Sequence, residues 1–109
     1  MPLLFAAMGS KQFVVQSRSR AGDGTLAPLG TRRDIESALA CRNTMSDHPG
    51  GDRLYGPGIE IDIAPEEDPV LQMLLTISDE DIAWDVILRL AREFQWKIVD
   101  PNSGRELSP

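Results

Sequence analysis

The sequence has very little cysteine, since Cys41 is the only one among 109 residues. One cysteine cannot form an intramolecular disulfide, whereas small secreted domains usually carry several paired cysteines, so we expect a cytoplasmic protein. Arg42 follows Cys41 and could activate the thiol if the two side chains met. Neighbouring residues on a helix do not face each other, so the sequence favours a partly buried, unreactive thiol.

Basic residues are also scarce, because 11 Lys and Arg stand against 17 Asp and Glu and give a net charge of −6. Nucleic-acid binding depends on clustered basic side chains, and RNA-binding sheets also stack bases on aromatic residues, of which the expected central strands offer only Phe13. The opening eight residues are apolar, but they are too short for an export signal and no basic residue precedes them. We therefore expect neither a nucleic acid nor a membrane as partner.

No catalytic, cofactor or metal-binding pattern occurs at a diagnostic spacing. His48 is the single histidine, and the glycines near it make the segment too flexible to hold an imidazole in place for catalysis. Asp100, Asn102 and Gly104 resemble the start of a calcium loop, but the later glutamate is missing, so they predict a turn. We expect no catalytic residues, no metal and no cofactor, and we favour a protein that is not an enzyme.

Hydrophobic periodicity divides the chain into four strands and two helices. Alternation of apolar and polar residues indicates strands and is clearest over residues 59–63, where three isoleucines share one face. Thr31 and Ser78 are the expected capping residues of the helices. The expected elements are a strand over 12–17, a helix over 31–43, strands over 59–63 and 70–77, a helix over 78–95 and a strand over 96–100. Residues 44–58 predict a long loop, and residues 101–109 predict a tail.

The order strand, helix, strand, strand, helix, strand resembles the ferredoxin-like fold. This resemblance implies an α+β protein with a four-stranded antiparallel sheet, two helices on one face, and the strands 12–17 and 70–77 in the centre. It places strand 59–63 nearer an edge. Function does not follow from it, since this fold carries many unrelated activities. We expect one domain over residues 1–109, in which residues 1–11 are either disordered or an extension from an upstream start.

Acidic residues are unevenly distributed along the chain. Residues 1–55 carry seven basic and five acidic side chains, whereas residues 56–109 carry four basic and twelve acidic ones. Carboxylates stabilise the start of a helix and charges protect an edge strand from pairing with other chains, which explains part of the excess. The crowding of Glu66, Glu67 and Asp68 in one turn is explained less well, and a basic partner would relieve their repulsion.

Trp84 and Leu88 extend the apolar arc of the second helix beyond what one sheet face covers. They either pack against the first helix or stay exposed as anchors of an interface, where Trp is enriched. Our first hypothesis is a non-enzymatic interaction protein, an adaptor or an immunity-type neutraliser, that binds a protein with a basic surface or a second copy of itself. Its candidate contacts are Glu60, Asp62, Glu66, Glu67, Asp68, Trp84 and Leu88. Without ligand spacing, these carboxylates predict a solvated edge and not a cation site.

The alternative hypothesis is a ligand-binding regulatory module, or a weak enzyme, in which residues 44–58 close as a lid over the open sheet face. Its candidate residues are Arg18, Arg20, His48, Asp52, Arg53 and Tyr55. The two first-named arginines follow the first strand, where related folds hold an anion-binding arginine, but the rest of that motif is not matched. We favour the interaction protein because no titratable cluster converges at a recognisable spacing.

Overall fold

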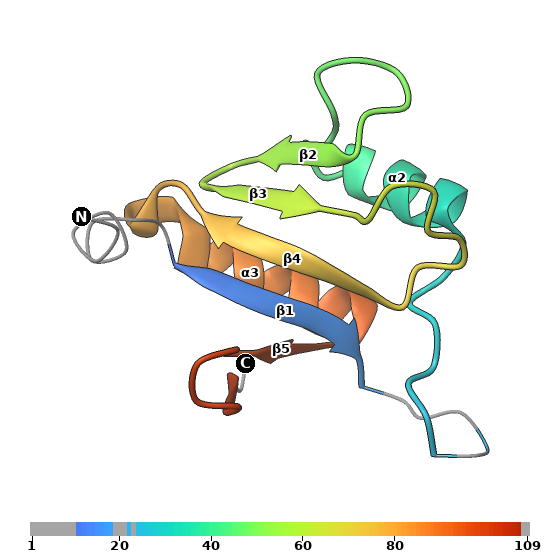
Figure 1. Cartoon of the computed structure of the whole chain (residues 1–109). Coiled ribbons are helices and arrows are strands. Elements are labelled where there is room, and N and C mark those ends of the chain that lie inside the picture. The colour runs from blue at the N-terminus through green and yellow to red at the C-terminus, as the bar shows by residue number, and fades with distance from the viewer. Residues whose placement is uncertain (1–10, 19–21, 23, 108–109) are drawn as a thin grey trace, which may run out of the picture.

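The structure is a computed structural model that describes residues 11–18, 22 and 24–107 (Figure 1). One antiparallel sheet and two helices form an α+β arrangement, which confirms the predicted class. The elements are β1 (Gln12–Ser17), α2 (Arg32–Ala40), β2 (Arg53–Gly56), β3 (Ile59–Asp62), β4 (Gln72–Ile77), α3 (Glu80–Phe94), β5 (Trp96–Val99) and β6 (Glu106–Leu107). The expectation for residues 1–11 lies outside the described residues except at Lys11.

The sheet has six strands in the order β2-β3-β4-β1-β5-β6, and all neighbours pair antiparallel. The four expected strands lie in its middle, and β4 and β1 are central as predicted. Two strands were not predicted, because β2 lies in the expected loop over 44–58 and β6 lies in the expected tail. The prediction of a four-stranded sheet was therefore wrong by one short strand at each edge.

One face of the sheet is apolar because buried and polar residues alternate along each strand. Ile61 of β3 is fully buried, while Glu60 and Asp62 on either side of it point to the opposite face. The register continues this alternation across the sheet, since Ile61 pairs with Leu75 of β4, and Leu75 pairs with Phe13 of β1. Full burial of one such side chain contributes roughly 1.5–3 kcal/mol.

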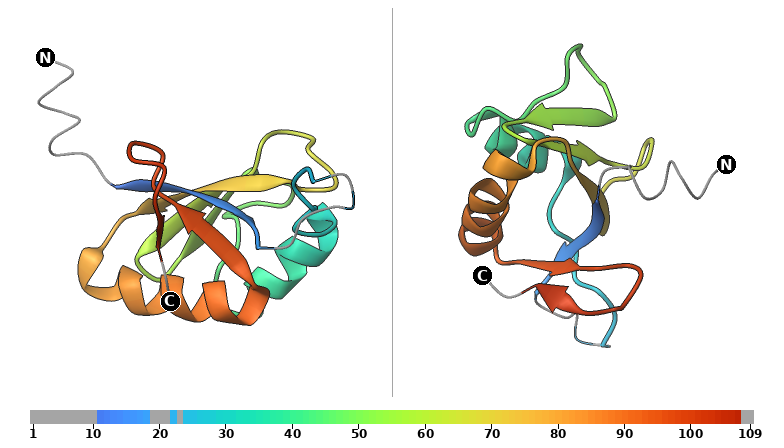
Figure 2. Two further views of the ribbon diagram at one scale, coloured as in Figure 1. Left: turned by 90° about the horizontal axis from the view of Figure 1, so that it is seen from below. Right: turned by 90° about the vertical axis from the view of Figure 1, so that its left-hand side faces the viewer.

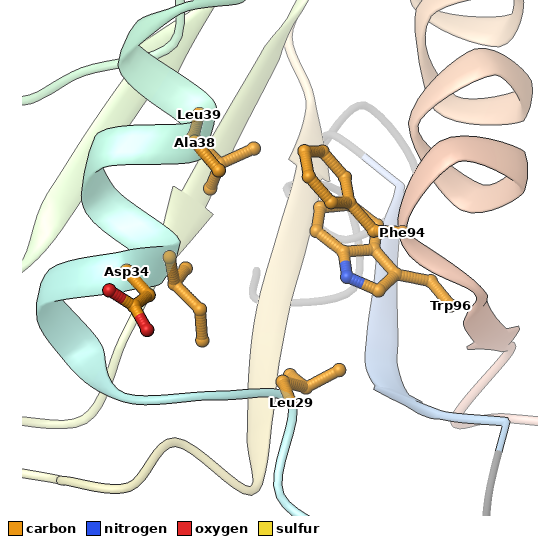
Figure 3. A pocket seen from close by; sticks show the side chains of 7 residues that line it. Leu29, Asp34, Ala38, Leu39, Phe94 and Trp96 are labelled. Atoms are coloured by element: carbon orange, nitrogen blue, oxygen red, sulfur yellow. The ribbon is translucent and has the colours of Figure 1, made fainter.

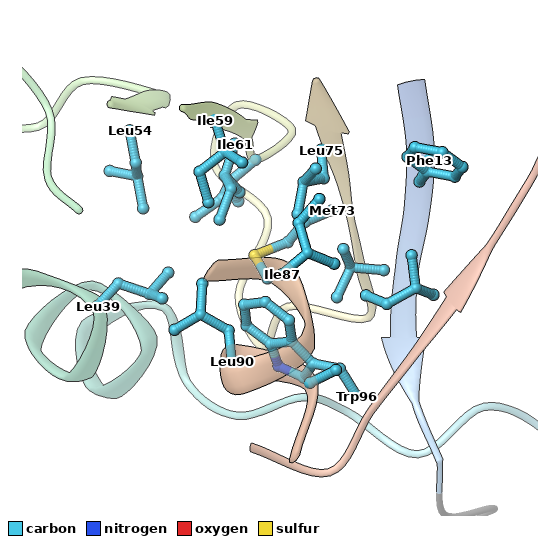
Figure 4. Close-up of a cluster of buried hydrophobic side chains, with 14 of the residues drawn as sticks. Phe13, Leu39, Leu54, Ile59, Ile61, Met73, Leu75, Ile87, Leu90 and Trp96 are labelled. Carbon is cyan, nitrogen blue, oxygen red and sulfur yellow. The ribbon is translucent and has the colours of Figure 1, made fainter. Parts of the chain in front are cut away.

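Both helices cover the apolar face of the sheet (Figure 2). Figure 4 shows how their inward side chains meet those of the strands between the two layers. The buried helix residues are Ile35 and Leu39 of α2 and Ala83, Ile87, Leu90 and Ala91 of α3. Trp96 at the start of β5 is 4% exposed and stacks on Phe94 with 5.4 Å between ring centroids, so it closes the core below α3 as predicted.

The segment between α2 and β3 is more regular than a long loop. Leu54 is 2% exposed and anchors β2 in the core, and β2 pairs with β3. β3 is therefore an interior strand, which corrects the expected edge position of residues 59–63. Met45 and Tyr55 exchange two backbone hydrogen bonds of 3.1 and 2.8 Å, which cover part of the free edge of β2. The rest of this loop extends beyond the β2 edge and does not lie over the open sheet face (Figure 1).

The ends of α2 follow from capping and backbone geometry. Thr31 caps the helix as predicted, because its Oγ1 accepts the backbone N–H of Asp34 at 3.1 Å. The helix ends at Ala40, earlier than predicted, and Asn43 has a left-handed φ of 59° that a helix cannot continue through. Cys41 at the C-cap is exposed, so the expectation of a partly buried thiol was wrong.

The cap of α3 differs from the predicted one by a residue. Asp79 is the N-cap, since its carboxylate accepts the backbone N–H of Asp81 at 3.0 Å, whereas Ser78 was expected in this position. An aspartate at this point satisfies a free N–H and places a negative charge at the positive end of the helix. The helix ends at Phe94, one residue before the predicted end, and Gln95 adopts a left-handed φ of 58°.

The predicted turn after β5 is a hairpin turn. Asp100 accepts the backbone N–H of Asn102 on its side chain at 2.8 Å and that of Gly104 on its carbonyl at 2.7 Å. The chain then returns as β6 and pairs with β5. Arg18 fastens this hairpin to the end of β1, because its Nη2 contacts the Glu106 carboxylate at 2.6 Å.

Candidate functional site

Among the described residues, no helix covers the sheet face opposite α2 and α3 (Figure 2). Its centre is a small apolar group in which Val14 of β1 pairs with Leu74 of β4 on one side and with Val99 of β5 on the other. All three side chains are half-buried. Polar side chains flank them and bond across strands, from Gln12 to Thr76 and from Gln16 to Gln72.

One corner of this open face, where β3 leads into the turn before β4, is acidic. We call it the acidic corner and define it as Asp52, Glu60, Asp62, Glu66, Glu67 and Asp68. It contains five of the seven predicted partner contacts. It also contains Asp52, which the sequence had assigned to the alternative ligand site.

Arg53 of β2 is paired with two carboxylates of the acidic corner. Its Nε lies 2.7 Å from Asp62 Oδ1, and its Nη1 lies 3.4 Å from Glu60 Oε1. The hydrogen bond that Arg53 donates to Asp62, and then the charge of the same carboxylate, raise the pKa of Arg53. Arg53 pairs in register with Asp62, and Glu60 lies two residues away on the same face of β3, so the antiparallel β2–β3 hairpin brings these opposite charges together.

Arg32 at the start of α2 joins the helix to the acidic corner. Its Nη2 contacts the Asp52 carboxylate, its Nη1 donates to the carbonyl of Ala64 at 3.0 Å, and its Nε contacts Glu36 at 3.0 Å. The backbone N–H of the same residue donates to Asp68 Oδ1 at 3.1 Å. The Arg32 side chain is 16% exposed, so its role is to hold the turn before β4 against α2.

Glu67 has a structural role inside the turn. Its Oε2 accepts the backbone N–H of Leu71 at 2.6 Å and that of Gln72 at 3.4 Å. Together with the bond from Arg32 to Asp68, this explains part of the crowding of acid in residues 66–68. Glu66, by contrast, is exposed, has a left-handed φ of 62°, and makes no side-chain interaction with another described residue.

Carboxylates outnumber guanidinium groups at the acidic corner. Only three of its six carboxylates pair with a guanidinium group of another described residue, Asp52 with Arg32, and Glu60 and Asp62 with Arg53, and Arg32 is shared with Glu36 as well. Bonds from backbone N–H groups to Glu67 and Asp68 fix the turn but leave the charge in place. The acidic corner therefore keeps an excess of negative charge.

A shallow pocket of about 430 Å³ lies on the open face at the acidic corner. Asp52, Asp62 and Glu67 line it together with the apolar side chains of Val14 and Leu74. Among the described residues, no group of three or more acidic, histidine or cysteine side chains is arranged to hold a metal ion. The pocket instead combines separated carboxylates with an apolar surface, which suits a side chain with a long aliphatic stem and a cationic head.

Trp84 and Leu88 do not lie on this surface. The Trp84 ring packs against the core on the helix side of the sheet, edge-on to Phe13 with 5.7 Å between centroids. Both side chains are half-buried, and the aromatic ring that Trp84 contacts belongs to β1. The seven predicted contacts therefore divide between the two faces of the sheet.

The residues of the alternative ligand site are not brought together. Arg18 lies beside β5 and β6, where it also donates to the carbonyl of Trp96, and Tyr55 lies on β2 at the other edge of the sheet. His48 is exposed and contacts its neighbour Asp47 at 2.6 Å. Arg20 lies outside the described residues. Asp52 belongs to the acidic corner, and Arg53 pairs with two other carboxylates of it.

The helix side carries a pocket that the sequence did not predict. We call it the inter-helix pocket; it has a volume of about 180 Å³ and opens between α2 and the end of α3 (Figure 3). Its lining is Leu29, Asp34, Ile35, Ala38, Leu39, Phe94 and Trp96. Arg42 lies beyond it and joins the helices, with its guanidinium 3.0 Å from Glu93 and 4.5 Å from the Phe94 ring centroid. The signal in the sequence was the small Ala38 in an otherwise large apolar set.

Comparison with protein-family models, with curated proteins and with solved structures gives no significant match for this chain. None of the helices in the described part of the chain is long and apolar enough to cross a membrane. What the protein does must therefore be inferred from its own surfaces.

Proposed function

We infer that this protein is a non-enzymatic interaction domain whose acidic corner receives a basic protein partner. The observation that carries the inference is the pocket in which Asp52, Asp62 and Glu67 surround an apolar surface. A lysine or arginine side chain fits this combination, because its stem can cover Val14 and Leu74 while its head reaches a carboxylate.

The existing ion pairs do not prevent such a partner from binding. Arg53 is half-exposed, with 52% of its side chain accessible, and exposed ion pairs are worth about 0–1 kcal/mol. A partner cation can therefore take the place of Arg53 beside Asp62 at little cost. Glu66 is available without any exchange. The excess of carboxylates also speeds encounter with a positively charged surface.

The acidic corner favours a different protein over a second copy of this chain. A symmetric dimer through this surface would set the same carboxylates against each other, and like charges in contact disfavour association. An adaptor or an immunity-type neutraliser of a basic protein fits the surface better than self-association. The single, exposed cysteine is compatible with a reducing compartment, for which we propose the cytoplasm.

The scaffold that carries this surface is, in our proposal, a ferredoxin-like core with an added strand at each edge. The support is the order β3-β4-β1-β5 in the middle of the sheet, together with two helices on one face. β2 is the addition that matters for function, because it supplies Arg53 and is preceded by Asp52.

Titration with a lysine-rich peptide, followed by amide signals in ¹H–¹⁵N NMR spectra, tests the proposed function. We expect the shifts to concentrate in β3 and the turn before β4, and to be absent with a matched peptide that has glutamate in place of lysine. The double variant Glu60→Gln/Glu66→Gln should weaken binding about two- to tenfold, and added salt should weaken it further. These two carboxylates are chosen because neither holds the backbone of the turn.

The matched control is Asp81→Asn/Asp85→Asn, which removes the same charge at the start of α3, away from the acidic corner. It should leave the site of binding unchanged and weaken the affinity less. Equal losses in the two double variants would mean that net charge alone attracts the peptide. That result, or shifts centred elsewhere, would refute the proposed site.

A further inference from the structure

The inter-helix pocket contains a polar group that has no partner among the residues that the structure describes. Trp96 is only 4% exposed, yet its Nε1–H donates no hydrogen bond to any other described residue. No fully buried side-chain nitrogen or oxygen among these residues lacks a partner, so the unpaired Nε1–H is partly accessible, and Trp96 lines the pocket. In Figure 3 the indole nitrogen is on the side of the ring that faces α2.

The rest of the lining is apolar except at the mouth. Leu29, Ile35, Leu39 and Phe94 surround the indole, and the Phe94 ring stacks on it. An N–H donor in such surroundings gains from an acceptor, because leaving it unpaired costs free energy. Asp34 is exposed at the mouth, and its negative charge disfavours a ligand that carries a carboxylate or phosphate. The acceptor is therefore a neutral oxygen.

The size of the pocket limits the ligand to one ring. A volume of about 180 Å³ is slightly more than the ~150 Å³ apolar cavity that is known to accept benzene. Larger ligands need pockets of about 300 Å³ or more. A six-membered ring leaves room for one small substituent directed at the indole.

We propose that the inter-helix pocket binds a small neutral ligand made of one six-membered ring with a hydroxyl or carbonyl oxygen that accepts the hydrogen bond of Trp96 Nε1–H. The ring packs between Ile35, Leu39 and Phe94, as apolar burial requires. This site lies on the opposite side of the sheet from the acidic corner, so it does not depend on the proposed function. Regulation by, or sensing of, a phenol-like metabolite is the kind of activity that such a site supports.

Phenol and toluene are a suitable pair of probes, because they share size and shape while toluene lacks the oxygen. The chain has two tryptophans, so the ¹H–¹⁵N spectrum has two indole signals, which Trp84→Phe assigns. Phenol should move the Trp96 signal and leave that of Trp84 nearly unchanged. Phenol should also bind about fivefold more tightly than toluene, the effect of one neutral hydrogen bond.

Two variants separate the parts of the proposal. Ala38→Leu fills the pocket from α2 with a good helix-forming residue and should abolish the phenol-dependent shift. The control is Ala40→Leu on the same helix, which lines a different pocket and should bind phenol like the wild type. Trp96→Phe keeps an aromatic ring and removes the donor, so it should remove the preference for phenol over toluene.

The proposal is overturned if the Trp96 signal does not move with phenol, or if phenol and toluene bind equally to the wild type. It is also overturned if Ala38→Leu binds phenol as well as Ala40→Leu does. Should Trp96→Phe fail to fold, the comparison of Ala38→Leu with Ala40→Leu still tests the proposal, since both variants keep Trp96.

Discussion

Gly56 at the end of β2 lies against Thr44, and this contact gives a sharp test of how β2 is held. A Cβ atom at position 56 would lie 2.5 Å from Thr44 Oγ1, 3.1 Å from its Cγ2 and 3.2 Å from its Cβ. Thr44 cannot easily move away, because it is 0% exposed and its hydroxyl donates to the carbonyl of Arg42 at 3.2 Å. We therefore expect Gly56→Ala to strain the junction between α2 and β2.

The expected cost follows from two opposing effects. Overpacking a filled site costs about 1–3 kcal/mol, whereas replacing glycine by alanine restricts the unfolded chain and gains about 0.4–1 kcal/mol. Gly56→Ala should therefore lower the free energy of unfolding by about 1–2 kcal/mol, or the melting temperature by about 4 °C per kcal/mol. Gly22 is the matched control, since a Cβ there meets nothing within 4 Å and its φ lies outside the left-handed range that side chains avoid.

Urea denaturation followed by tryptophan fluorescence measures both variants, and a double-mutant cycle isolates the contact. Thr44→Ala alone should destabilise the protein, because it removes a buried methyl group and the hydroxyl that donates to Arg42. In the Gly56→Ala background the same change removes the clash, so the two effects should be non-additive by about 1 kcal/mol or more. If Gly56→Ala is as stable as Gly22→Ala, or if the cycle is additive, the close packing of β2 on Thr44 is wrong.

Two further predictions concern local structure, in addition to the binding tests given above. Asp79→Ala should lower the stability by about 1 kcal/mol because it removes the N-cap of α3, and Ser78→Ala should lower it much less. Thermal unfolding of both variants would show which residue caps the helix, and equal losses of stability would contradict the assignment. Leu54→Ala should lower the free energy of unfolding by about 2–4 kcal/mol because the side chain is 2% exposed, while Tyr55→Ala on the exposed face should cost far less. If urea denaturation shows no loss of stability for Leu54→Ala, this segment is a loop and not a strand anchored in the core.

The sequence by itself determined the elements whose signal is local. Alternation over residues 59–63, the apolar run before Ile77 and the helical spacing around Ile87 are short-range patterns, and each predicted its element. The alternation and the helical spacing also predicted an inward face. The burial of Trp96 and the cap at Thr31 also follow from residues within one or two turns of the chain.

Tertiary structure alone decided β2 and the acidic corner. β2 is four residues long between glycines and prolines, and its register depends on β3 and on the backbone of Met45 rather than on its own pattern. The charges of residues 66–68 were visible in the sequence, but the bond from Arg32 to Asp68 joins residues 36 positions apart that only folding brings together. The bond from Leu71 to Glu67 is local, but no pattern in the sequence predicted it.

The inter-helix pocket shows the same division most clearly. Its apolar residues read as ordinary core in the sequence, and Trp96 was predicted to be buried. Whether the indole N–H finds a partner depends on the separation of α2 and α3, which is set by how two helices fit on one twisted sheet. Local patterns determine which side chains face inward, whereas spaces and unpaired groups between elements arise from packing over long sequence distances.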